Sequence, residues 1–367
     1  MKHFKIGYIL RDNGACGYYR LTLPLTALQR YAGCEVLKIE RGDKADKILQ
    51  YLQKSDVIIV PRVGEEMFVE YIPRIKGLGK KIIIDHDDNM FCISPMSPHY
   101  EEAGTENVQV CVNGEMLPLW EDGKNIDLAR NRARCVNFKK AMNAADMVTV
   151  TQPILADVYR EYNPKVKVLP NCVDMKLWQR LSLQPHDGIR IGWLGGSSHY
   201  EDWLMISPAI TEIMNRYSQT RLILMGAKFD GTLKGIPRNR IEFHEWVHTE
   251  AYPLKAAILD LDMAIIPLQD TEFNRCKSNI KWVEMGALQI PCVTSFVSPY
   301  KESATEENGI YIKDNDVGAW CDGLDLLIKD PLLRARMGAE AHKTVGMHFD
   351  INTKWHLWHD AYQELMT

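Results

Sequence analysis

Several features that would assign the chain to a specialised class are missing from its 367 residues. The nine cysteines form no C-x-x-C pair and show no regular spacing, so neither a zinc knuckle nor a secreted disulfide framework is predicted. The first apolar run, Ile6–Leu10, ends at Arg11 and Asp12, too early for a signal peptide or a membrane span. These absences predict a cytoplasmic protein, with only a peripheral association with membranes left open.

The chain also lacks a charge excess, internal repeats and low-complexity tracts. With 44 Lys and Arg against 48 Asp and Glu, the net charge is −4, which predicts no general attraction to nucleic acid or acidic membranes. Contact with DNA would need a local patch, and one predicted helix carries a basic cluster. That cluster consists of Arg130, Arg132, Arg134, Lys139 and Lys140. It is interpreted either as a solvated helix face or as a DNA contact.

What the sequence does contain is typical of an α/β protein with two domains. An apolar fraction of 46% is enough to build two cores. Short β-branched runs alternate with longer amphipathic stretches, the pattern of parallel strands joined by helices. The predicted strands are 5–10, 57–60, 81–84, 147–150 and 166–169 in the first half, and 190–194, 221–225, 241–243, 263–266 and 292–294 in the second. A stretch rich in Pro, Asp and Gly, Leu181–Gly188, predicts the hinge.

Domain boundaries follow from this pattern. We expect a first domain over 1–183, a second over 184–345, and a helix over 346–367 that packs back on the first domain. An insertion at about 92–127 contains a predicted hairpin, 108–112 and 115–119, with its turn at Asn113-Gly114. The hairpin is either surface decoration or a flap that faces an acceptor.

The segment Phe273–Pro291 carries the clearest chemical signal. Lys277, Lys281 and Glu284 fall on one face of a predicted helix. Two lysines four residues apart near a helix start repel each other and oppose the helix dipole, at roughly 0.3–1 kcal/mol each. A bound anion would remove this conflict. The alternative is a solvated face on which Glu284 pairs with Lys281.

Backbone groups add to this anion site. The N–H groups near Ser278 and Asn279 begin the same helix, so a diphosphate is predicted to bind at its N-terminus. Glu284, one to two turns further on, is placed to accept hydrogen bonds from ribose hydroxyls.

This segment resembles the signature of the retaining family-four glycosyltransferases (glycosyl transferases group 1), which have the GT-B fold. Glu284 and Pro291 match the second glutamate and the proline of that signature, and Lys277, Ser278 and Lys281 fit a K-S-x-x-K variant. Cys276 stands where the family has its first glutamate. The resemblance implies two doubly wound Rossmann-like domains facing across a cleft, with Cys276 bordering the sugar of the donor.

Two further segments support the resemblance. Val166–Asp174 is similar to the strand and P-N-G-V-D turn that closes the family's first domain, with Cys172 in place of Gly, although Pro170 and Asn171 also make an ordinary turn. Arg190–Ser198 is similar to the opening strand and glycine loop of the second domain. Its Gly195, Gly196 and Ser197 are expected to approach phosphate. The family's usual arginine is absent from this loop, which leaves His199, Tyr200 or a lysine elsewhere to replace it.

Two loops of the first domain are also candidates. Gly14 and Gly17 are expected to bring the chain near the donor, and Arg20 to serve as a charge partner; a plain strand-to-helix turn is the alternative. The strand over 81–84 ends in D-H-D-D, at the edge where parallel sheets bind ligands. We expect His86 or Asp87 to contact the acceptor or sugar. The alternatives are a metal held by Asp-x-Asp and a helix cap by Asp88.

The resemblance implies transfer of a glycosyl group from a nucleotide diphosphate sugar to an acceptor hydroxyl, with retention, no metal and no cofactor beyond the donor as co-substrate. The catalytic candidates are Lys277, Glu284, His86 and Asp87. The expected acceptor is a glycan or a lipid-linked sugar, with a hydroxymethylated base in DNA as a further option. Two alternatives remain: a partner that binds sugar nucleotide without catalysis, and a nucleotide-sugar epimerase of the same fold.

Overall fold

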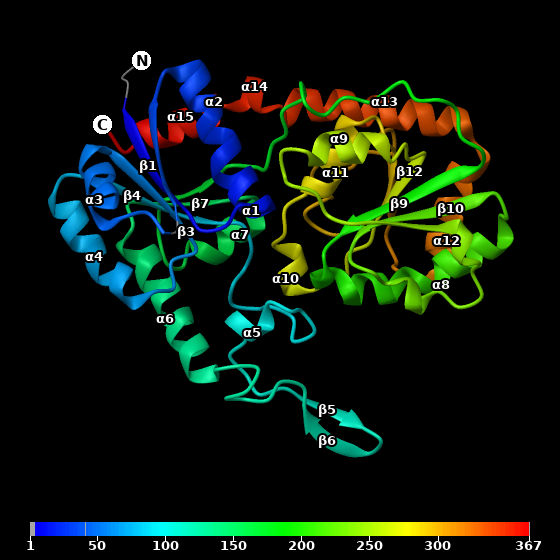
Figure 1. Ribbon diagram of the computed structural model, residues 1–367, viewed down its shortest axis with the longest axis horizontal. Coiled ribbons are helices and arrows are strands. Elements are labelled where there is room, and N and C mark those ends of the chain that lie inside the picture. The colour runs from blue at the N-terminus through cyan, green and yellow to red at the C-terminus, as the bar shows by residue number, and fades with distance from the viewer. Residues whose placement is uncertain (1–3, 41, 367) are drawn as a thin grey trace. The chain divides into compact units, whose positions relative to one another are not determined.

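A computed structural model of the chain describes residues 4–40 and 42–366. Its residues divide into two compact units (Figure 1). The first unit holds the described residues up to Asn171, together with Cys276–Ser278 and the residues from Thr353 onward. The second holds Cys172–Arg275 and Asn279–Asn352. Each unit is built on its own six-stranded sheet.

The sheet of the first unit is entirely parallel, with strand order β2-β1-β3-β4-β7-β8. Its strands are β1 (Lys5–Leu10), β2 (Glu35–Glu40), β3 (Val57–Pro61), β4 (Lys81–His86), β7 (Met147–Val150) and β8 (Val166–Val168). Its helices are α1 (Ala15–Gly17), a π-helical turn over Tyr18–Thr22, α2 (Leu23–Ala32), α3 (Ala45–Lys54), α4 (Glu66–Gly77), α5 (Tyr100–Ala103), α6 (Leu128–Ala144), α7 (Pro153–Tyr159) and α15 (His356–Gln363).

The second unit repeats this plan, with strand order β11-β10-β9-β12-β13-β14 and all strands parallel. Its strands are β9 (Ile189–Gly195), β10 (Thr220–Gly226), β11 (Ile241–His244), β12 (Met263–Ile266), β13 (Cys292–Ser295) and β14 (Ile310–Ile312). Its helices are α8 (Tyr200–Arg216), α9 (Tyr252–Ile258), α10 (Glu272–Arg275), α11 (Ile280–Ala287), α12 (Val317–Lys329) and α13 (Pro331–His348), with 3-10 turns over Ser197–His199, Asp230–Thr232 and Arg238–Arg240; α14 (Ile351–Lys354) lies at the boundary between the units. Helices α8 and α12 cover one face of the sheet, and α9, α11 and α13 cover the other (Figure 1).

The predicted fold of two parallel α/β domains is confirmed. All ten predicted strands are present, because buried strands of parallel sheets are almost continuously apolar and stand out in the sequence. Two strands escaped prediction. The first, β2, lies at a sheet edge, and only one of its six side chains is fully buried. The second, β14, is only three residues long and also lies at an edge, so neither leaves a strong hydrophobic pattern.

The predicted hairpin is also confirmed. Strands β5 (Gln109–Val112) and β6 (Glu115–Pro118) pair antiparallel around Asn113 and Gly114. Both turn residues have positive φ, 53° and 87°, as a two-residue hairpin turn requires. The hairpin extends away from the sheet of its own unit (Figure 1).

The ends of the units differ from the predicted domain ends. The residues 181–187 have no helix or strand, as expected of a linker, but the chain passes to the second unit earlier, after Asn171. The last helix belongs to the first unit, where Trp358 and Tyr362 are buried and Trp355 stacks on Tyr31 of α2. Among the described residues, no helix is long and apolar enough to cross a membrane.

Candidate functional site

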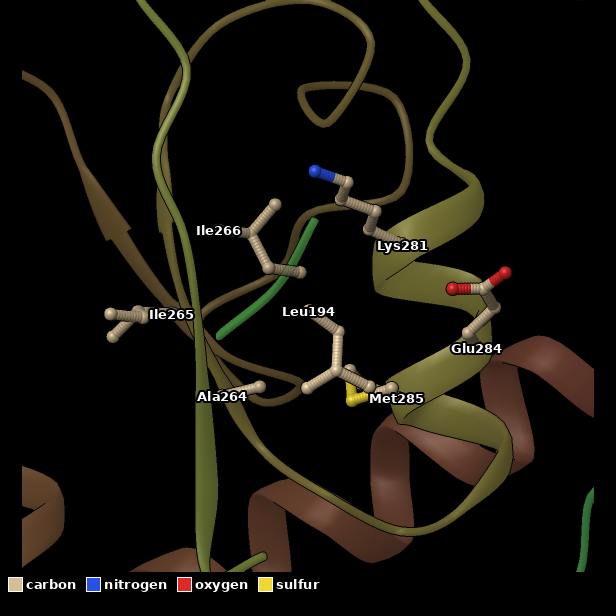
Figure 2. Close-up of a pocket in the computed structure, with 7 residues that line it drawn as sticks. All are labelled: Leu194, Ala264, Ile265, Ile266, Lys281, Glu284 and Met285. Atoms are coloured by element: carbon tan, nitrogen blue, oxygen red, sulfur yellow. The ribbon is translucent and has the colours of Figure 1, made fainter. Parts of the chain in front are cut away.

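The sheet of the second unit has a pocket at its topological switch point. From β9 the chain continues to β10 on one side, while β12 pairs with β9 on the other. Open parallel sheets bind ligands at the carboxyl ends of strands at such a point. A pocket lies there, between the ends of β9 and β12 and helix α11. Its lining residues are Leu194, Ala264, Ile265, Ile266, Lys281, Glu284 and Met285 (Figure 2).

Lys281 lies against the glycine loop that follows β9. Figure 2 shows its side chain reaching from α11 toward Ile266. A Cβ atom built on Gly195 would lie 3.1 Å from Lys281 Nζ and 2.6 Å from the Trp193 ring. Gly195 is therefore needed for this close approach. The structure thus brings together Lys281 and the glycine loop, which the sequence analysis assigned to the donor from separate segments.

The loop leads from Gly196 into a 3-10 turn over Ser197–His199 and then into α8. The positive end of a helix dipole therefore lies at this edge of the sheet. His199 Nδ1 is 2.7 Å from Asp202 Oδ2, and because a carboxylate only accepts, Nδ1 carries the proton. The buried Asp202 also accepts from the backbone N–H of Gln269 and from Asn274 Nδ2. These three hydrogen bonds fix Asp202, which in turn fixes the orientation of His199 in the loop after β9.

Glu284 is 5% exposed and accepts a hydrogen bond from the Tyr252 hydroxyl, at 3.1 Å. Burial, reinforced by the charge of Glu284, raises the pKa of Tyr252 well above its usual value, so the phenol stays protonated and donates. Trp246 packs edge-on against Tyr252, and its ring lies 2.6 Å from a Cβ built on Gly226 at the end of β10. The sequence analysis missed Tyr252 and Trp246. The only available signal was the pair of aromatics in E-W-V-H-T-E-A-Y after β11.

Three other residues that the sequence analysis assigned to the donor site, Cys276, Lys277 and Ser278, belong to the first unit. Lys277 Nζ lies 3.9 Å from Asp88 Oδ1, and Ser278 Oγ accepts from Asn171 Nδ2 at 3.0 Å. Cys276 is 1% exposed and packs in the apolar core of that unit. Its thiol accepts a hydrogen bond from the buried Asn89 Nδ2 at 3.9 Å, so the structure buries the residue that was expected to border the donor sugar.

Asn279 forms the N-terminal boundary of α11 in the second unit. Its Nδ2 donates to Ser303 Oγ at 2.8 Å, and its carbonyl oxygen accepts from Trp282 and Val283 N–H. The Asn279 side chain is therefore engaged in holding the start of the helix.

Arg20 is buried, which corrects its expected role as a partner for the donor. Its guanidinium makes two bonds to Asp85, at 3.0 and 2.7 Å, and donates to Leu169 O and to Asn171 Oδ1. Thr149 Oγ1 also donates to Asp85. Buried ion pairs need this many hydrogen bonds to offset desolvation. Arg20 thus ties the end of β4 to the turn after β8.

The N–H groups of Gly14 and Gly17 both donate to Asp12 Oδ1, at 3.0 and 3.3 Å. A Cβ on Gly17 would lie 2.1 Å from Asp12 O, so glycine is required for the turn itself. The contacts with Asp12 explain why glycine is needed here, and the approach of this turn to a donor stays a prediction.

The D-H-D-D segment after β4 divides among different partners. Asp85 bonds to Arg20, Asp87 Oδ1 lies 3.7 Å from Arg62 Nε, and Asp88 lies near Lys277. Burial opposes ionisation of Asp87, but the charges of Arg62 and Arg20 and the hydrogen bonds to the carboxylate together outweigh burial and lower its pKa to about 2. Within residues 4–40 and 42–366, no group of three or more His, Cys, Asp or Glu side chains is arranged to hold a metal ion.

His86 lies in the core, 1% exposed, with its ring 4.8 Å from that of Tyr159 and 5.8 Å from that of Phe138. Among the described residues neither ring nitrogen has a hydrogen-bond partner. Burial lowers the pKa of His86 to about 3. His86 is therefore a neutral core residue, which does not fit the expected direct contact with an acceptor.

Part of the basic cluster on α6 makes contacts within the first unit. Arg132 Nε donates to Thr105 O, and Arg134 Nη1 donates to Glu102 O. Lys139 lies over the rings of Phe91 and Tyr162. Three of the five cations thus have internal roles.

Comparisons with known proteins agree with this geometry. Residues 188–330, less than half of the chain, match the family described as glycosyl transferases group 1. A search of curated protein sequences finds no match.

Several solved structures have similar folds over nearly the whole chain. HepE from Anabaena, in complex with UDP and glucose, has a TM-score of 0.65 and 13% identity, covering 98% of this chain and 100% of its own. Sucrose-phosphate synthase from Thermosynechococcus elongatus has a TM-score of 0.66 and 14% identity, covering 99% of each chain. A glycosyltransferase from Rickettsia africae has a TM-score of 0.68 and 11% identity, covering 100% of both. At these identities the likeness shows the GT-B type of fold.

Proposed function

We propose that the protein is a glycosyltransferase that moves a sugar from a nucleotide diphosphate sugar to an acceptor hydroxyl. The observation that carries the proposal is the placement of Lys281 over Gly195 in the pocket between β9, β12 and α11. A cation beside a glycine loop at a helix start is suited to a diphosphate. This pocket lies within the segment that matches glycosyl transferases group 1.

We assign the diphosphate, the ribose and the base of the donor to different residues in and beside this pocket. Lys281 and the N–H groups at Gly196 and Ser197 face the diphosphate, and His199 stands in for the missing loop arginine. Glu284, held by Tyr252, accepts from the ribose hydroxyls. The exposed ring of Trp246 offers a surface on which a base can stack. UDP is the first nucleotide to test, because the HepE structure contains it.

The proposed reaction retains the anomeric configuration. The acceptor oxygen bonds to the anomeric carbon, the bond from that carbon to the distal phosphate oxygen breaks, and the acceptor proton passes to the leaving phosphate. Negative charge grows on the diphosphate during this step. Preorganised positive groups that stabilise such charge commonly supply the largest part of catalysis. Lys281 and the helix start of α8 would supply it here, and we therefore expect activity without added metal.

Lys277 and Ser278 stay candidates, since they directly precede Asn279, where α11 begins. Asp88 and Asn171 hold them in the first unit. We propose no carboxylate nucleophile.

The test combines nucleotide binding with product analysis. Lys281→Ala should weaken UDP binding at least tenfold by calorimetry, because a charge-assisted hydrogen bond contributes about 1.5–3 kcal/mol. Glu284→Ala should act in the same direction. Lys343→Ala, an exposed lysine of α13, is the matched control and should bind UDP like the wild type. Unchanged affinity in both site variants would refute the assignment.

Mass spectrometry of the protein with UDP-sugars, with and without acceptors, then separates the functions. Nucleotide release that depends on an acceptor supports transfer. An isomerised donor would instead identify an epimerase, and binding without any product would identify a partner that lacks catalysis.

A further inference from the structure

The hairpin of the insertion, β5 and β6, is a sheet of two strands, and no third strand joins it among the residues that the structure describes. Val112, Met116 and Leu117 are exposed apolar side chains of this hairpin. A two-stranded hairpin has marginal stability by itself, and an open strand edge is a template for a further strand. The hairpin therefore has two edges at which pairing is to be considered.

The hydrogen bonds of the hairpin decide which backbone groups reach the free edge of β5. In an antiparallel pair, every second residue exchanges hydrogen bonds with the partner strand. Val108 O accepts from Leu119 N–H at 2.8 Å, so the even-numbered residues of β5 are the ones that bond to β6. The N–H and C=O groups of Gln109 and Cys111 consequently point away from β6, toward the free edge.

This edge of β5 lacks the features by which proteins prevent edge pairing. Its sequence over Gln109–Val112, Q-V-C-V, contains no charged residue and no proline, and the strand pairs with β6 without a bulge. The free edge of β6 differs, because Glu115 brings a charge and Pro118 has no N–H to donate. We therefore expect a further strand to add at β5 and not at β6.

A second copy of β5 complements this edge. A two-fold axis brings two β5 strands together antiparallel, with Val110 opposite Val110 of the second copy. Gln109 of each copy then lies opposite Cys111 of the other, so the outward N–H and C=O groups of both residues bond across the interface. Shifting the strands toward the turn would instead place Gln109 opposite Asn113, whose φ of 53° is not that of a strand.

The side chains favour the same register. With Val110 opposite its own copy, Val108 lies opposite Val112 of the second copy, and Val112 opposite Val108. Valine therefore faces valine at each of these positions on one face of the joined sheet. Cross-strand pairs of β-branched residues contribute roughly 0.2–1 kcal/mol each, and no like charges oppose each other between the two β5 strands.

We propose that the protein forms a dimer through β5, in which two hairpins join into one four-stranded antiparallel sheet of order β6-β5-β5-β6. The partner is a second copy because the edge is uncharged and complements itself. An anionic lipid surface is a poorer partner, since the hairpin strands contain Glu115 and neither Lys nor Arg. So small a contact makes a weak dimer, and the folding of the two units does not depend on it.

The first test is sedimentation velocity of the full-length protein over a concentration series, which should show a monomer–dimer equilibrium. Cys111→Pro removes an N–H that points to the free edge and leaves the bonds to β6 in place. It should raise the dissociation constant at least tenfold, because one backbone hydrogen bond is lost from each copy. Gln109→Lys, a charge on the edge, should act in the same direction and serves if Cys111→Pro does not fold. Met116→Lys, at an exposed position of β6, is the matched control and should dimerise like the wild type.

The second test is disulfide formation in a Cys111→Ser background, which removes the exposed thiol of β5. Val110→Cys should form a linked dimer in oxidised glutathione, because directly opposed residues that are not hydrogen-bonded have Cα atoms about 4.5 Å apart, within the span of a disulfide. Val112→Cys in the same background should link much more slowly, since it lies opposite Val108.

Three results would overturn the inference. One is a wild type that stays monomeric at every concentration; if that monomer binds phosphatidylglycerol vesicles, the hairpin is a membrane contact instead. Another is a dimer that neither Cys111→Pro nor Gln109→Lys weakens, which would place the contact elsewhere. The last is faster linking through Val112→Cys than through Val110→Cys, which contradicts the register.

Discussion

Trp246 is a large aromatic side chain with 49% of its surface exposed, and it follows β11 in the sheet that carries the proposed donor pocket. Its ring packs against Tyr252, whose hydroxyl holds Glu284. An exposed ring in this position suits stacking with a nucleobase, an interaction worth about 1–3 kcal/mol.

We therefore predict that Trp246→Ala weakens UDP binding about tenfold and that Trp246→Phe restores most of the loss, both measured by calorimetry. Leu254→Ala, at an exposed position of α9, controls for removal of apolar surface and should have no effect. A Trp246→Ala variant with wild-type affinity would place the base elsewhere.

His86 should make the stability of the protein depend on pH. Its folded pKa of about 3 lies below the ordinary value of 6.5, so between these values the unfolded chain binds a proton that the folded chain does not. Stability therefore rises with pH through this window, by up to about 1.4 kcal/mol per pH unit.

The check is the thermal midpoint from pH 4 to pH 7. His86→Leu should show a shallower pH dependence than the wild type and at least equal stability at pH 7, because leucine suits an aromatic, apolar site. His348→Gln, at an exposed position of α13, should follow the wild-type curve. Identical slopes for all three proteins would show that His86 is not the group responsible.

At the scale of the elements, Arg20 connects three parts of the first unit. It lies in the π-helical turn before α2 and bonds to Asp85 in β4 and to the turn after β8. Removing one partner of a buried pair leaves an uncompensated charge, at a cost of about 3–5 kcal/mol.

Arg20→Met should therefore lower the stability of the first unit strongly, and adding Asp85→Asn should recover part of the loss. Hydrogen exchange of amides in β4 and β8 measures this locally. Arg74→Met, an exposed arginine of α4, should leave exchange unchanged. Normal protection in Arg20→Met would mean that the network adds little to stability.

At the scale of the whole molecule, the chain returns to its first unit at the end. The described residues from Thr353 onward join that unit, and Trp358 and Tyr362 are buried there, at 1% and 2% exposure. Truncating a buried aromatic residue typically costs 3–5 kcal/mol.

Deleting the residues from His356 onward should therefore lower the thermal midpoint of the first unit by about 10 °C or more, as followed by calorimetry. Replacing Gln109–Pro118 by a short Gly-Ser link removes a similar length of exposed hairpin and should leave the midpoint nearly unchanged. Equal effects of the two deletions would contradict a structural role for the final helix.

The amino-acid sequence by itself determined the architecture. Ten strands, the Asn113-Gly114 turn and the division into two α/β domains were all predictable, because hydrophobic periodicity and turn chemistry act over short stretches of chain. Lys281, Glu284 and the glycine loop could also be nominated, since their spacing within one helix or one loop is visible in the sequence.

Only the tertiary structure decided what each nominated residue contacts. Arg20, His86 and Cys276 look like site residues in the sequence, but the fold buries all three. Trp246, Tyr252 and Arg62 gave little signal, because their positions depend on which strands become neighbours in the sheets. Burial and charge pairing join residues far apart in the chain, such as Arg20 with Asp85, and no local pattern records that proximity.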